Sequence, residues 1–190
     1  MPNPFIERIL KIETTDIRLY ALIGVAATWS SEIERSIFWC YVAASALPTH
    51  QAADTFYQRV QFDRKRRLAD KAVHSKLAGT PDDVTWTDLN RRLEDLLGER
   101  ENDRNLVSHN PLAVNMYVLK AGTQSVVLAK AEISQSTALV KTGKRKPRTV
   151  GVPEMADYCE RLMALQFDLE RFLEAVLELP RSHPERCAWQ

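Results

Sequence analysis

The feature that most constrains the fold is a segment of about thirty residues, from Thr15 to Ala46, that contains no proline and is mainly apolar. The run Thr14-Thr15-Asp16 offers a capping hydroxyl and an acid for the first turn of a helix, and Pro48 ends the helix. Its centre carries three charges that exclude a membrane-spanning helix: Glu32, Glu34 and Arg35. The sequence therefore predicts a long amphipathic helix that forms the spine of a bundle.

Apolar residues also recur at helical spacing before and after this spine. Asn3 and Pro4 predict the N-cap and first turn of a short helix that ends near Ile12. Residues 51–77 contain one or two helices, whose inward positions are expected to be Phe56, Val60, Leu68, Ala72 and Val73.

Two further helices are predicted nearer the C-terminus. Thr85 and Asp88 resemble a capping box, with Asp in place of Glu, and a helical stripe comprises Trp86, Leu89, Leu93, Leu96, Leu97 and Arg100. Pro153 starts the last helix, with an apolar face of Met155, Tyr158, Cys159, Leu162, Met163, Leu165, Phe167, Leu169, Phe172 and Val176. The fold class is therefore mainly α, an up-and-down helical bundle.

The segment between these two helices has a different character. Val114–Leu119 and Ser125–Leu128 are rich in β-forming residues on either side of a turn at residues 121–124, which predicts a hairpin. A weaker pair joins Ala138–Val140 to Thr149–Val150. We expect a small β-hairpin insertion at about residues 112–150, within a single domain of residues 1–180, and a loose tail at residues 181–190.

Composition is that of an ordinary globular protein, with 45% hydrophobic and 27% charged residues. Although the formal net charge is only +1, residues 48–79 carry seven Lys or Arg against three acids, and residues 111–151 carry seven against one. Residues 80–110 and 152–190 each carry four Lys or Arg against eight acids. A basic segment between two acidic ones is typical of a surface that docks a polyanion, but charges that alternate along solvated faces produce the same pattern.

Three cysteines, without metal-ligand spacing, indicate reduced thiols, and the N-terminus shows no secretory signal. We therefore expect a cytoplasmic protein with no membrane partner. The sequence has no H-E-x-x-H, no C-x-x-C and no glycine-rich phosphate loop, so we expect no metal site and no cofactor.

The most specific chemical pattern is the hexapeptide from Arg104 to His109. Arginine offers a fixed charge with a fork of donors, and histidine exchanges a proton near neutral pH. On a regular helix the two side chains project about 140° apart. A second copy of the chain, related by a twofold axis, would place two such pairs in one cleft. That cleft suits RNA cleavage through attack of the 2′-hydroxyl, and Asn105 would orient a reacting group.

Arg104, Asn105 and His109 resemble the signature of the HEPN superfamily, in which Arg, often followed by Asn, precedes His by four to six residues. This resemblance implies an all-α bundle, a homodimer and a metal-independent endoribonuclease of a toxin–antitoxin or defence system, with a cognate antitoxin as partner. The superfamily also includes non-catalytic members that act as dimerisation, nucleotide-binding or regulatory modules, so such a role is an alternative for this chain. A structural role stays open as well, with Arg104 paired to Glu101 or Asp103.

The basic loop of residues 141–148 is the candidate RNA-binding segment, with Lys141, Lys144, Arg145, Lys146 and Arg148 following the phosphate backbone. The alternative is that these residues form a solvent-exposed hairpin tip that binds no RNA. Glu32 and Glu34 are expected to be solvated or ion-paired, although one could face the cleft. The remaining aromatic and histidine residues are expected to have no catalytic role. Trp29 and Trp39 should lie in the core, and His50, His74 and His183 should lie on the surface.

Overall fold

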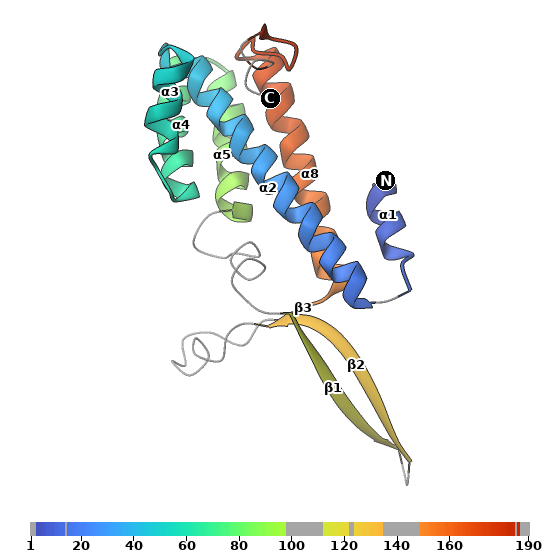
Figure 1. The fold of residues 1–190 in the computed structure, drawn as a ribbon. Helices are drawn as coiled ribbons and strands as arrows, with labels where there is room; N and C mark the ends of the chain where they lie inside the picture. The colour runs from blue at the N-terminus through green and yellow to red at the C-terminus, as the bar shows by residue number, and fades with distance from the viewer. Residues whose placement is uncertain are drawn as a thin grey trace. The chain divides into compact units, whose positions relative to one another are not determined.

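The computed structural model describes residues 3–13, 15–97, 112–121, 124–134, 149–184 and 186, and it is mainly helical in that part of the chain (Figure 1). The chain divides into two compact units. Unit 1 combines Met1–Ala27 with Asp103–Glu160, and unit 2 combines Thr28–Asn102 with Arg161–Gln190. The two long helices α2 and α8, defined below, contribute residues to both units.

Helix α1 spans Pro4–Leu10 and begins as the sequence predicts. The side chain of Asn3 accepts a hydrogen bond from the backbone N–H of Phe5 at 2.8 Å, and Pro4 occupies the first turn, where no N–H is needed. Ile6 and Ile9 are buried and form the inward face of this short helix.

Helix α2 spans Thr15–Ser45, which confirms the predicted long helix that ends before Pro48. Ala46 has a positive φ of 54°, so the helix stops in a left-handed residue two positions before the proline. In unit 2 its buried side chains include Ile33, Ile37, Phe38 and Trp39. Among the described residues, no helix is both long and apolar enough to cross a membrane.

Residues 49–77 form two helices, α3 at Thr49–Tyr57 and α4 at Phe62–Leu77. Phe56 and Val73 are fully buried, as predicted. The prediction that Val60 points inward is wrong, because this residue lies in the four-residue connection between the helices and is 91% exposed. The prediction assumed that the helical pattern continues through residues 58–61, but the chain is not helical there, so the one apolar residue of the connection does not face the core.

Helix α5 spans Asp82–Leu97 and packs on α4. It begins three residues earlier than the predicted capping box, so Thr85 lies inside the helix. Pro81 precedes the first residue, and Asp82 and Asp83 place acids in the first turn, where the helix dipole favours them. The predicted stripe is confirmed as far as Leu97 by the burial of Trp86, Leu89, Leu93, Leu96 and Leu97, and its last member, Arg100, lies outside the described residues.

Strands β1 (Leu112–Ala121) and β2 (Gln124–Ser134) are antiparallel, in a register that runs from Leu112 opposite Ile133 to Ala121 opposite Gln124. The short strand β3 (Thr149–Val150) is the third strand, and it pairs antiparallel with Ser134 and Ile133 of β2. The sequence proposed Ala138–Val140 as the partner of β3, and that segment lies outside the described residues.

Helix α8 spans Val152–Ala175, close to the predicted start at Pro153. The carboxylate of Glu154 accepts a hydrogen bond from the N–H of Gly151 at 3.0 Å and so caps the N-terminus. Most of the predicted apolar face is buried, but Phe167 is 54% exposed. Phe167 departs from the three- and four-residue spacing of the buried positions Leu162, Leu165, Leu169 and Phe172, so it lies off their stripe.

Candidate functional site

The predicted catalytic residues Arg104, Asn105 and His109 lie outside the described residues, and so do all five candidates in the basic loop: Lys141, Lys144, Arg145, Lys146 and Arg148. The structure therefore brings none of them together, and their roles stay predictions. The described part of the helix that precedes the motif ends at Leu97, seven residues before Arg104.

Helix α5 is firmly held within unit 2. The indole N–H of Trp86 donates a hydrogen bond to Asp70 of α4 at 2.9 Å, and its ring packs on Phe172 of α8 with centroids 5.4 Å apart. Arg92 of α5 binds Asp168 of α8 at 2.8 Å. The helix before the motif is thus fixed by contacts with two other helices.

The run Arg64-Lys65-Arg66-Arg67 divides into two buried and two exposed cations. Lys65 donates a hydrogen bond to Glu34 of α2 at 2.6 Å, and its ammonium lies 5.1 Å from the ring centre of Tyr57. Arg66 is 4% exposed and binds Asp63 at 2.9 Å and the amide oxygen of Asn90 at 2.8 Å. Lys65 and Arg66 therefore join helices to one another and are not available to an external anion.

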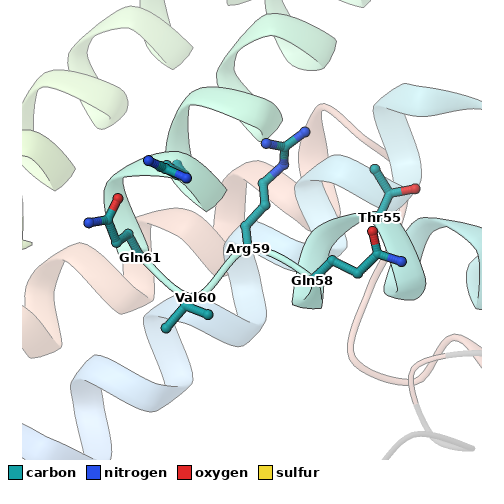
Figure 2. A pocket seen from close by; sticks show the side chains of 6 residues that line it. Thr55, Gln58, Arg59, Val60 and Gln61 are labelled. Carbon is teal, nitrogen blue, oxygen red and sulfur yellow. The ribbon is translucent and has the colours of Figure 1, made fainter.

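One of the exposed members, Arg64, borders a hollow at the connection between α3 and α4, which we call the basic cleft. Figure 2 shows Arg59 extending from this connection, with Gln61 on one side and Gln58 and Thr55 on the other. The cleft has a volume of about 510 Å³ and is lined by Thr55, Gln58, Arg59, Val60, Gln61 and Arg64. A second hollow, lined by Arg59, Arg64, Arg67 and Leu68, adjoins it through the two shared arginines.

A buried polar network joins α2, α8 and the C-terminal segment of unit 2. Glu170 accepts hydrogen bonds from Ser36 at 2.7 Å, from Arg181 at 2.9 Å and from Arg186 at 3.0 Å. Burial by itself would raise the pKa of Glu170, but the hydrogen bonds from Arg186, Ser36 and Arg181 outweigh it and hold the pKa below its ordinary value. Glu170 is therefore an ionised structural anchor.

Arg186 and Arg181 lie in the segment that the sequence predicts as a loose tail. Arg186 is only 4% exposed, donates to the carbonyl of Leu179 at 3.0 Å and lies 5.9 Å from the ring centre of Trp39. This anchor could not be predicted from the sequence, because a lone arginine beyond the last helical stripe carries no periodic signal.

The other acids and histidines singled out in the sequence have mainly structural partners. Glu32 binds Arg35 and Glu34 binds Lys65, as the ion-paired interpretation predicts. His50 is exposed. His74 differs from the expectation of an isolated surface residue, because its ring contacts both Asp83 and Asp70 and links α4 to the start of α5.

Cys40 and Cys159 are free and buried. Burial raises the pKa of the Cys159 thiol to about 12 and raises that of Cys40 as well, so neither forms a reactive thiolate near neutral pH. We expect at most one of the three cysteines to react with a thiol reagent in the folded protein, and all three to react in concentrated guanidinium. Rapid reaction of two or more thiols in the native protein would contradict the buried positions of Cys40 and Cys159.

Among the described residues, no group of three or more His, Cys, Asp or Glu side chains is arranged to hold a metal ion. Comparisons of the chain with protein-family models, with curated proteins and with solved structures find no match.

Proposed function

We propose that this protein is a metal-independent endoribonuclease of the HEPN type, with Arg104, Asn105 and His109 as its catalytic residues. The observation that carries the proposal is the Arg-Asn-x-x-x-His pattern, which follows a helix with a buried leucine stripe in a mainly helical chain. The proposal includes the finer architecture, an up-and-down bundle with a β-hairpin insertion before α8.

In the proposed reaction, the 2′-oxygen of the substrate forms a bond to the adjacent phosphorus while the bond from phosphorus to the 5′-oxygen breaks. His109 of one copy takes the proton from the 2′-hydroxyl, and the protonated His109 of the second copy donates a proton to the leaving 5′-oxygen. The products are a 2′,3′-cyclic phosphate and a 5′-hydroxyl. Arg104 stabilises the charge on the pentacovalent phosphorus, and Asn105 orients a reacting group.

A homodimer would supply the second histidine and arginine, because one regular helix projects the two side chains about 140° apart. The basic loop of residues 141–148 would hold the RNA backbone, and a cognate antitoxin would restrain the enzyme within a toxin–antitoxin or defence system.

Light scattering measures the oligomeric state and therefore tests the proposed dimer directly. A monomer at micromolar concentration would remove the composite cleft.

We expect the purified wild-type protein to cleave single-stranded RNA in the presence of excess EDTA, because the proposed proton transfers need no metal ion. The products should carry 2′,3′-cyclic phosphate ends, which are detected as a mobility shift after acid treatment and phosphatase. A DNA strand of the same sequence is the matched control and should stay intact, since it lacks the attacking hydroxyl. Cleavage that stops in EDTA, or that also cuts the DNA, would contradict this mechanism.

The alternative is a non-catalytic HEPN-like module that dimerises, binds a nucleotide or regulates a partner. Three acids close to the motif favour it, because Glu99, Glu101 and Asp103 would repel RNA phosphates and could neutralise Arg104. Under this alternative the wild type is inert toward every RNA, and Arg104→Ala mainly lowers the melting temperature.

A further inference from the structure

We propose that the basic cleft between α3 and α4 is a docking site for the phosphate backbone of single-stranded RNA, with Arg59 and Arg64 as its principal contacts. The assignment of RNA as the ligand rests on the proposed function. The site itself belongs to unit 2 and contains none of the catalytic candidates.

The charge balance at this corner of unit 2 carries the proposal. Residues 58–67 contain five cations and one acid, Asp63. Lys65 is neutralised by Glu34, whereas Arg66 and Arg67 both bind Asp63, at 2.9 and 2.7 Å. Within the part of the chain that the structure describes, neither Arg59 nor Arg64 has a carboxylate within ion-pair distance. Two uncompensated guanidinium groups therefore border one hollow.

The geometry of the corner keeps these charges exposed. Arg59 sits in the connection between the helices and Arg64 in the first turn of α4, so both side chains border the solvent-exposed hollow. Arg64 and Arg67 are three residues apart on α4 and therefore share a face of the helix. Arg67 is 70% exposed but is bound to Asp63, and Arg66 also lies 3.6 Å from Glu94, so the uncompensated charge of this face belongs to Arg64. Two guanidinium groups on one open hollow, Arg59 and Arg64, can each bind a phosphate of the same strand.

The uncharged groups of the cleft fit a nucleic acid strand. Gln58 and Gln61 present amides that can both donate and accept hydrogen bonds, as base edges and ribose hydroxyls require. Val60 is 91% exposed, and Tyr57, which directly precedes Gln58, is 46% exposed. Val60 lines the cleft and supplies exposed apolar surface beside its arginines, which favours contact with unstacked bases.

The test is the affinity of a fluorescently labelled single-stranded RNA for full-length protein that carries His109→Ala, which keeps the RNA intact. Adding Arg59→Gln and Arg64→Gln should weaken binding about tenfold at low salt and flatten the slope of log affinity against log salt by about 1.4. The control pair Arg91→Gln and Arg171→Gln removes the same charge from exposed arginines that already face carboxylates, and should leave the affinity within about twofold.

Failure of this proposal is distinct from failure of the proposed function. If the RNase is real and the cleft docks RNA, the Arg59/Arg64 variant in the wild-type background should raise KM about tenfold with little change in kcat. RNA binding that depends on Arg59 and Arg64 without any cleavage would sustain the docking site and overturn the catalytic proposal. Equal binding by the Arg59/Arg64 and Arg91/Arg171 variants, or tighter binding to anionic lipid vesicles than to RNA, would overturn the docking site.

Discussion

His109→Ala is expected to reduce the rate of RNA cleavage by at least about 100-fold, because general acid–base catalysis by a positioned side chain contributes typically 10²–10⁴-fold. The loss should appear in kcat, because the imidazole transfers a proton in the transition state and does not contribute to binding of the substrate in the ground state. The measurement is single-turnover cleavage of a labelled RNA by protein whose circular dichroism and melting temperature match those of the wild type.

The matched control for this prediction is His50→Ala, which removes an exposed histidine from α3 and should leave the rate unchanged. Arg104→Ala should also lower the rate by about 100-fold, because its charge stabilises the transition state. In an inducible bacterial strain, wild-type protein should arrest growth and degrade RNA, whereas the His109→Ala protein should not. Equal cleavage by wild type and His109→Ala would exclude His109 as the proton-transfer group.

Glu170→Gln is expected to lower the free energy of unfolding by about 3 kcal/mol, because it leaves the buried guanidinium of Arg186 without its carboxylate. The glutamine keeps the size of the side chain, so the loss reports charge and hydrogen bonding and not a cavity. Urea unfolding measures the effect, which corresponds to a fall of about 6–12 °C in melting temperature for a chain of this length. A change below about 0.5 kcal/mol would show that the network contributes little.

The same network gives a pH dependence with a defined sign. Since the pKa of folded Glu170 lies below its ordinary value of 4.5, the ionised carboxylate stabilises the folded state above that pH, and this contribution is lost as the pH falls below it. Wild-type stability should therefore decline more steeply below pH 4.5 than that of Glu170→Gln. Asp95→Asn is the control, because Asp95 is exposed beside the exposed Arg91 and should change stability by less than about 1 kcal/mol.

Much of the helical architecture was predictable because it depends on local sequence. Asn3 and Pro4 mark the start of α1, the absence of proline permits α2, and the spacing of Trp86, Leu89 and Leu93 marks the buried face of α5. Each of these signals acts over one or two helical turns, so it can be interpreted without knowing what packs against the helix. The capping box at Thr85 failed, because Pro81 and the acids that follow it start the helix earlier.

The tertiary structure alone decided which charged residues are buried. The sequence shows four consecutive cations at residues 64–67. Only the contacts of Lys65 with Glu34 and of Arg66 with Asn90, both from other helices, separate the buried pair from the exposed pair. Arg186 is likewise an anchor because Glu170, sixteen residues away, lies beside it. Burying a charge costs free energy unless a partner from elsewhere in the chain meets it. That partner is set by the packing of helices, so the helical stripes followed from the sequence while the basic cleft emerged only from the fold.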